Sequence, residues 1–318
     1  MTQKVLVTRG IPAAGLHLLE DFDVTVLSEK PPERDELLEA VSGAAGILSI
    51  LTEMIDAEVM DAAGDDLKVI ANMAVGYDNI DVEAATERGL VVTNTPGILE
   101  ETTADTAFML LLAAARRLGE AERFLRAGKW EAWGPKQFTG PDVWGKTLGI
   151  IGFGGIGQSV ARRAKGFGMD ILYTARSRKE EAEKEFEARK VELDELLEES
   201  DFVSIHTPLT EETQHLIGEK ELDSMKSTAV LVNASRGPVV DEAALAEALE
   251  KGSIFAAGLD VYEEEPRVHP KLLELENVVL APHIGSASIE TRDKMAEMAA
   301  ENLRAVLNGR EPETPVDV

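Results

Sequence analysis

The sequence of 318 residues contains no cysteine. This excludes disulfide bonds, thiolate nucleophiles, and zinc or iron–sulfur sites held by cysteine. Aromatic residues are also scarce, at 5% of the chain, so a core has to be built mainly from Ala, Val, Leu and Ile. The hydrophobic share of 44% still indicates a globular protein, and a chain of this length favours two domains over one.

Basic residues are few: 32 Lys and Arg stand against 59 Asp and Glu, which gives a net charge of −27. Such a surface repels nucleic acid and anionic membranes, so we expect neither as a partner. Solubility and a saline habitat both explain this acidity, and the sequence leaves the choice open. An anionic ligand would need local cations, which draws attention to arginines that follow apolar stretches.

Long apolar runs are missing as well. The longest, Ala104–Ala115, is interrupted by Asp105 and Thr106 and is too short to span a bilayer. The segment Met1–Val7 leads into a strand pattern and lacks the apolar stretch of a signal peptide. We therefore expect a soluble protein of the cytoplasm.

The chain does contain two series of short apolar runs that alternate with helical patterns, one before Thr95-Pro96-Gly97 and one from Lys146 onward. This alternation is typical of parallel sheets covered by helices on both faces. We expect an α/β fold with two doubly wound, parallel-sheet domains, Rossmann-like or flavodoxin-like, and a cleft between them. A charged, solvated helix is expected over Lys179–Lys190. The predicted strands are 4–8, 24–27, 46–50, 68–71, 90–93, 147–152, 170–174, 202–206, 229–233, 256–259 and 278–280.

The glycine-rich run Gly152–Gly157 follows a predicted strand and opens a predicted helix, which is the context that a dinucleotide-binding loop requires. Gly152 permits a tight turn, Gly154 lets the backbone approach a pyrophosphate, and Gly157 lets helix and strand pack closely. The free amides of the first helical turn then face the phosphates. The expected cofactor-binding residues of this loop are Gly152, Gly154, Gly155, Ile156 and Gly157.

The next predicted strand ends just before Ala175. Enzymes that use NAD place an acidic residue at this strand end, where it binds the ribose hydroxyls. Here Ala175 is followed by Arg176, Ser177 and Arg178, and guanidinium groups would attract a 2′-phosphate. These three residues are therefore expected to bind the cofactor, with NADP(H) preferred. Use of NAD(H) stays open, because the absence of an acid removes the repulsion of a 2′-phosphate but does not show that the arginines bind one.

Candidates for proton transfer are few, since the chain has five histidines. His206 and His283 both follow predicted strands, where ligands of open α/β sheets bind, and position alone does not choose between them. Arg236 also follows a strand and could hold a carboxylate with two hydrogen bonds. A carboxylate beside the histidine would orient its ring, but spacing does not separate Glu265 from its two acidic neighbours.

Five motifs in one order carry a resemblance over nearly the whole chain. They are Val75–Asp81, Gly152–Gly157, Asn233–Gly237, Gly258–Pro266 and Pro282–Gly285. With them the sequence resembles the D-isomer-specific 2-hydroxyacid dehydrogenases, and within that family it is most similar to glyoxylate/hydroxypyruvate reductases. The resemblance implies that NAD(P)H reduces a small 2-oxo acid. It also implies a discontinuous substrate domain, 1–99 plus 286–318, and a nucleotide-binding domain, 100–285.

The resemblance assigns roles to single residues. Arg236 would anchor the substrate carboxylate and carbonyl, Glu265 would orient His283, and His283 would donate the proton. Further expected substrate contacts are Leu51, Val75 and Gly76. Further expected cofactor contacts are Thr103, His206, Thr207, Pro208, Ala234, Ser235, Asp260, His283 and Gly285. No metal is expected.

The same resemblance implies a homodimer, formed through the apolar helix that begins near Thr102 and through the segment that carries Trp130, Trp133 and Trp144. Which 2-oxo acid is reduced stays open. A related dehydrogenase for phosphoglycerate, D-lactate or phenylpyruvate is an alternative, as is a cofactor-sensing corepressor without turnover. A formate dehydrogenase is disfavoured, because that family would pair its histidine with Gln, whereas here the residue is Glu265.

Overall fold

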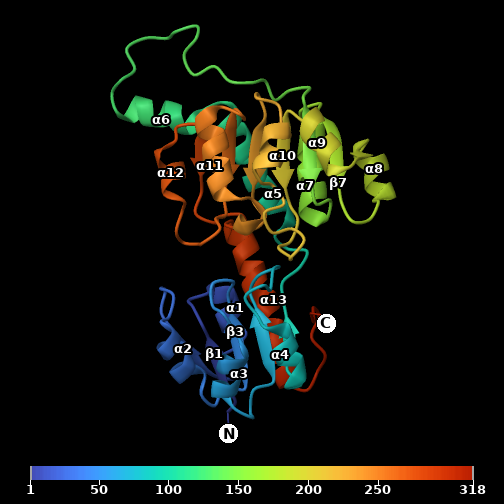
Figure 1. Ribbon diagram of the computed structural model, residues 1–318. Coiled ribbons are helices and arrows are strands. Elements are labelled where there is room, and N and C mark those ends of the chain that lie inside the picture. The colour runs from blue at the N-terminus through green and yellow to red at the C-terminus, as the bar shows by residue number, and fades with distance from the viewer. Residues whose placement is uncertain (1, 317–318) are drawn as a thin grey trace. The chain divides into compact units, whose positions relative to one another are not determined.

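The computed structural model describes residues 2–316, and the chain divides into two compact units (Figure 1). Unit 1 comprises Met1–Leu99 and Ala287–Val318, and unit 2 comprises Glu100–Ser286. Each unit contains one sheet in which every pair of neighbouring strands is parallel. The α/β fold with two parallel sheets, which the alternating apolar runs predict, is confirmed.

Unit 1 has a five-stranded sheet with the order β2-β1-β3-β4-β5. Apolar side chains fill both of its faces, and apart from the largely exposed edge strand β2 its strands are near-continuous hydrophobic runs. Helices α1 and α13 cover one face, while α2, α3 and α4 cover the other. The strands are β1 (Lys4–Val7), β2 (Asp23–Val26), β3 (Gly46–Ser49), β4 (Val69–Asn72) and β5 (Val91–Thr93), and the helices are α1 (Ala13–His17), α2 (Arg34–Val41), α3 (Ala57–Ala63), α4 (Val82–Glu87) and α13 (Ile289–Leu307).

Unit 2 has a seven-stranded sheet with the order β12-β11-β10-β9-β6-β7-β8. Helices α5, α7 and α8 pack on one face, and α9, α10, α11 and α12 pack on the other. The strands are β6 (Thr147–Ile151), β7 (Asp170–Thr174), β8 (Arg189–Lys190), β9 (Phe202–Ile205), β10 (Val230–Asn233), β11 (Ala256–Leu259) and β12 (Val278–Leu280). The helices are α5 (Glu100–Ala115), α6 (Leu118–Arg126), α7 (Gly155–Gly166), α8 (Glu180–Phe186), α9 (Leu193–Glu199), α10 (Glu219–Ser224), α11 (Glu242–Lys251) and α12 (Pro270–Glu274).

The helix expected over Lys179–Lys190 is wrong in its second half. Helix α8 ends at Phe186, Glu187 turns the chain with a φ of 53°, and Arg189–Lys190 pairs with β7 as an edge strand. The expected solvated face is present, since Glu180, Glu181, Lys184 and Glu185 are exposed, whereas Ala182 and Phe186 are buried in the core of unit 2. These two residues are four apart, so they lie on one face of the helix and bury it against the sheet.

Parallel pairing brings the carboxyl ends of all strands of a sheet to one edge. In unit 2 the strand order reverses between β6 and β9, and ligands of open α/β sheets bind beside such a point. The segments that follow β6, β7, β9, β10, β11 and β12 all emerge at this edge, and they carry most of the expected site residues.

Two further features concern the surface. Between α6 and β6, residues 127–146 run as a long loop (Figure 1), on which Trp130, Trp133 and Trp144 are exposed. Within residues 2–316, no helix combines the length and the apolar character needed to cross a membrane.

Candidate active site

The glycine loop after β6 has the shape of a phosphate cradle. Gly152 has a φ of 91°, and a β-carbon on it would lie 2.6 Å from the carbonyl carbon of His206. A β-carbon on Gly157 would lie 2.2 Å from the carbonyl oxygen of Gly152, so α7 can approach the strand only with glycine there. Gly154 is exposed and has open space on its side-chain face. The residues present therefore fit a pyrophosphate at the N-terminus of α7.

The cations expected after β7 have unequal surroundings. Arg178 forms an ion pair with Glu183, with its Nη2 2.8 Å from Oε2 and its Nε 3.0 Å from Oε1. The Tyr173 hydroxyl also donates to Glu183, and these two donors lower the pKa of that carboxyl. Arg176 and Ser177 are exposed, and no acidic side chain follows the strand before Arg176. The two arginines are therefore not equivalent as partners for a phosphate.

His206 follows β9 and is half-buried. Its Nε2 lies 2.8 Å from the Ser204 hydroxyl, and its Nδ1 is buried without a hydrogen-bond partner among the described residues. Desolvation lowers the pKa of His206 to about 3. A ring that stays neutral at pH 7 is a poor proton donor, so this histidine does not compete with His283 for that role. Thr207 and Pro208 follow it beside Gly152, where the Thr207 nitrogen would meet a β-carbon at 2.7 Å.

The other histidine, His283, is paired with Glu265. Its Nδ1 lies 2.7 Å from Oε2 of Glu265, while Oε1 of the same carboxylate accepts from the backbone N–H of Tyr262 at 3.1 Å. The two acidic neighbours have other partners, since Glu263 pairs with His215 and Glu264 with Arg267. A proton on Nδ1 satisfies the carboxylate and leaves Nε2 for a ligand.

The turn that carries His283 is held by the buried carboxylate of Asp260. His283 has a φ of 54°, which is unusual for a residue with a side chain. Asp260 accepts from the backbone N–H groups of Ile284 and Gly285, each at 2.7 Å, and burial raises its pKa. Thr103 of α5 lies against Gly285, with its Oγ1 3.5 Å from the position of a β-carbon. Thr103, Asp260 and Gly285 are thus in one cluster.

Arg236 lies in a turn after β10 that the Asn233 side chain organises. Asn233 donates to the carbonyl of Arg236 at 2.9 Å and accepts from the N–H and hydroxyl of Ser235 at 3.1 and 3.0 Å. Ala234 is buried in this turn. Arg236 is half-buried, and one of its Nη groups donates to the Ser235 carbonyl. The direction of the guanidinium is therefore partly set by its own turn.

Sequence reasoning missed Glu242, which holds the Glu265 loop from the start of α11. It is buried, its carboxylate accepts from the N–H groups of Glu263 and His269 at 2.6 and 3.2 Å, and burial raises its pKa. Gly237 packs so closely on this loop that a β-carbon would lie 1.9 Å from the Tyr262 carbonyl carbon. An acidic residue directly after Asp241, which is a residue type common at helix N-caps and caps α11 in the structure, was the available signal.

In unit 1 the expected substrate contacts follow β3 and β4. Leu51, Val75 and Gly76 are all half-buried. The carbonyls of Val75 and Gly76 accept from the side chains of Asn94 and Asn72, at 2.8 and 2.9 Å. Among residues 2–316, the N–H groups of Val75 and Gly76 donate to no protein acceptor. Two amides left without an acceptor are suited to bind an anion.

A phosphate cradle and a histidine–carboxylate pair at one edge of a parallel sheet define the class of nucleotide-dependent oxidoreductases. Across the described part of the chain, no cluster of three or more His, Cys, Asp or Glu side chains has a metal-binding arrangement.

Comparison with known proteins supports this class. Residues 108–285 match the model of the D-isomer specific 2-hydroxyacid dehydrogenase, NAD binding domain. A glyoxylate reductase of Korarchaeum cryptofilum is 57% identical, over 98% of this chain and 95% of that protein. A crystal structure from Thermus thermophilus has a TM-score of 0.94 at 48% identity, over 99% of this chain and 100% of that one.

A further solved structure comes from Sinorhizobium meliloti. This NADPH-dependent glyoxylate/hydroxypyruvate reductase, in complex with NADP and malonate, has a TM-score of 0.87 at 35% identity, and the match covers 99% of this chain and 97% of that one. The chain belongs to the D-isomer-specific 2-hydroxyacid dehydrogenase family and is an oxidoreductase.

The clamp formed by Asp260 leads to a stability prediction. Asp260→Ala leaves the buried N–H of Gly285 and the half-buried N–H of Ile284 without their acceptor, so we expect the free energy of unfolding to fall by about 2–3 kcal/mol. Denaturant titration followed by circular dichroism measures this change. Asp142→Ala is the matched control, because Asp142 is exposed in the same unit, and its effect should stay within about 0.5 kcal/mol. Equal effects of the two substitutions would contradict the clamp.

Proposed function

We propose that this enzyme reduces a small 2-oxo acid to the 2-hydroxy acid with NAD(P)H, and that glyoxylate and hydroxypyruvate are its substrates. The observation that carries the proposal is the 2.7 Å contact between His283 and Glu265, at the sheet edge that also carries the glycine loop. The names of the relatives support the choice of substrates, since those from Korarchaeum cryptofilum and Thermococcus onnurineus are called glyoxylate reductases.

Each expected residue has a task in this proposal. The loop Gly152–Gly157 holds the pyrophosphate, and the reduced nicotinamide, when bound, supplies a hydride for the carbonyl carbon. His283 donates a proton from Nε2 to the carbonyl oxygen. Glu265 keeps the proton of Nδ1 in place and stabilises positive charge on the ring. The remaining cofactor contacts are assigned to Thr103, His206, Thr207, Pro208, Ala234, Ser235, Asp260 and Gly285.

Each unit contains hydrogen-bond donors that are suited to a carboxylate. Arg236 in unit 2 offers a planar fork that matches a carboxylate with two hydrogen bonds and polarises the adjacent carbonyl. Unit 1 contributes the N–H groups of Val75 and Gly76, which have no acceptor among the described residues. Leu51 borders the side chain of the 2-oxo acid and favours small substrates. Local donors of this kind are needed because the chain as a whole is strongly acidic.

The function is tested with a panel of 2-oxo acids assayed with NADH and NADPH. We expect turnover of glyoxylate and hydroxypyruvate, and a fall of roughly 10²–10⁴-fold in kcat for His283→Gln, because a general acid is lost. His17→Gln is the matched control, since His17 is exposed on unit 1 and should leave kcat unchanged. Absence of turnover with every 2-oxo acid would overturn the function, and a normal kcat for folded His283→Gln would remove the proton donor.

The preference for NADPH is part of the same proposal, and it depends more on Arg176 than on Arg178. Ala175 follows β7 where an acid would repel a 2′-phosphate. Both arginines are exposed just after β7, but Arg178 already shares its charge with Glu183 in an ion pair, whereas Arg176 interacts with Glu212 only at longer range. The NADP bound to the Sinorhizobium meliloti relative supports the preference.

We therefore expect Arg176→Gln to raise the KM for NADPH by about 10-fold, since a charged hydrogen bond to phosphate contributes about 1.5–3 kcal/mol. Arg178→Gln should raise it less, because Glu183 competes for that guanidinium. The KM for NADH is the internal control and should change by less than a factor of about two in either variant. Equal KM values for NADPH and NADH in the unaltered enzyme would disprove the preference.

A homodimer also belongs to this proposal. Trp130, Trp133 and Trp144 are 56%, 80% and 72% exposed. Tryptophan side chains are on average much more buried than this, and gathered apolar surface of this kind is typical of interaction sites. Leu118 and Leu125 of the neighbouring helix α6 are exposed as well. A partner subunit that covers this region would remove the unfavourable surface from water.

Light scattering at micromolar concentration should thus give twice the 34.4 kDa of one chain. Trp133→Gln should weaken the dimer, because a large apolar side chain is lost from the proposed interface. Met54→Gln serves as control, as Met54 is a comparably exposed apolar residue of unit 1. A monomer mass for the unaltered protein would rule out the dimer.

A further inference from the structure

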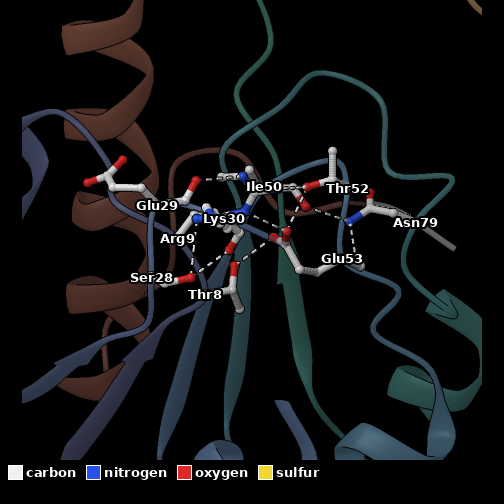
Figure 2. Close-up of polar contacts among 9 residues, drawn as sticks. All are labelled: Thr8, Arg9, Ser28, Glu29, Lys30, Ile50, Thr52, Glu53 and Asn79. Atoms are coloured by element: carbon white, nitrogen blue, oxygen red, sulfur yellow. Dashed lines mark hydrogen bonds and ion pairs between the residues drawn. The ribbon is translucent and has the colours of Figure 1, made fainter. Parts of the chain in front are cut away.

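A buried polar network lies at the carboxyl edge of the unit 1 sheet, and the proposed function makes no use of it. Its members follow β1, β3 and β4, and Figure 2 shows how part of it gathers around the turn after β3. Asn72 and Asn79 are 0% and 5% exposed, and Glu53 is 4% exposed. Burying polar groups is unfavourable unless they form hydrogen bonds. A buried network whose members are all bonded therefore holds the connected segments in one conformation.

Asn79 ties the two ends of one turn together. Its Nδ2 donates to the carbonyls of Ile50 and Glu53, each at 3.0 Å (Figure 2). These two carbonyls flank Leu51, which the proposed function places next to the substrate side chain. One amide group therefore sets the shape of the turn that presents Leu51.

Asn72 continues the network to the loop after β4. Its Nδ2 donates to the carbonyl of Gly76 at 2.9 Å and to Oδ1 of Asn79 at 3.1 Å, while its Oδ1 accepts from the Ser49 hydroxyl at 3.0 Å. The bond to the Gly76 carbonyl fixes the Gly76–Tyr77 peptide plane, which follows directly after the Gly76 N–H and so restricts the loop that presents the Val75 and Gly76 amides. The pair Asn72 and Asn79 thus connects the two segments of unit 1 to which substrate contacts are assigned.

The Glu53 side chain attaches the end of the turn after β3 to the segment that follows β1. Its carboxylate accepts from the hydroxyls of Thr8 and Thr52, at 2.8 and 2.6 Å, and from Nε of Arg9 at 3.2 Å (Figure 2). Arg9 also donates to the Glu29 carbonyl at 3.1 Å. A buried carboxylate with this many donors is held in one place.

We propose that Asn79, together with Asn72, is a positioning residue that sets the substrate-binding geometry of Leu51, Val75 and Gly76. The inference rests on the proposed reduction of 2-oxo acids. It assigns a role to the second half of the motif Val75–Asp81, of which the proposed mechanism uses only the first two residues. Asparagine is required because the site needs a donor to two carbonyls and an acceptor on the same side chain.

The test compares Asn79→Asp with a matched control in the same unit. Asp keeps the size of the side chain but loses the donor, and it brings a carboxylate against the carbonyls of Ile50 and Glu53. Asn302→Ala is the control. Asn302 lies on α13 and is 1% exposed, and it forms hydrogen bonds with Glu313 and Thr314 of the C-terminal segment, not with Asn72 or Asn79. Both variants should lose stability.

We expect Asn79→Asp to raise both the KM for glyoxylate and the inhibition constant of oxalate by about 10-fold or more, because misplaced amides bind a carboxylate poorly. Its kcat should fall by less than about threefold and its KM for the cofactor should not change, as expected when ground and transition state lose the same interaction. Asn302→Ala should leave all four constants unchanged. If Asn79→Asp does not fold, Asn72→Asp, which loses the bond to the Gly76 carbonyl, replaces it with the same expected result.

The outcomes separate this inference from the proposed function. If the unaltered enzyme turns over no 2-oxo acid, the function fails and the positioning role fails with it. If the unaltered enzyme is active, and both Asn79→Asp and Asn72→Asp keep normal constants for glyoxylate and oxalate, the positioning role alone is disproved. A lower melting temperature without any change in KM would show that the network is only structural.

Discussion

Parallel strand pairing is the constraint on which the other features of this enzyme depend. Since all strands of a sheet run the same way, their carboxyl ends meet at one edge, and every following turn starts there. The glycine loop, His206, Arg236, Asp260 and the turn of His283 come from five different strands of unit 2. Residues that are far apart in the sequence are thereby brought to the same edge of the sheet by strand pairing alone.

Bringing the turns to one edge is not sufficient to form a site, because each turn must also hold its side chain in a fixed conformation. The structure uses one buried polar side chain for each. Asn233 shapes the turn of Arg236, Asp260 shapes that of His283, and Glu242 holds the loop that ends in Glu265. Asn72 and Asn79 do the same in unit 1. Each of these groups loses its hydration on burial and replaces it with hydrogen bonds to backbone groups that would otherwise be unpaired.

Charge is distributed in a way that restricts where anions can bind. Most arginines of this acidic chain are paired with carboxylates, such as Arg163 with Glu101 and Asp105, and Arg34 with Asp56 and Glu58. These pairs are largely exposed, so each contributes little to stability. Their effect is to leave few cations available for anionic ligands. Arg176 is therefore informative, because it is exposed at the strand end where a 2′-phosphate would bind.

By itself the sequence determined the class of fold, the approximate strands and the glycine loop, because apolar runs and glycine spacing are local properties that do not depend on distant residues. It did not separate Glu265 from Glu263 and Glu264, because three consecutive carboxylates are equivalent until the loop is folded. The tertiary structure decided that point, giving each carboxylate a different partner. It likewise decided that Glu242, Asn72 and Asn79 are buried anchors and that the helix after Lys179 ends early. Their partners lie on other segments, and such pairings arise only when the sheet edge is assembled.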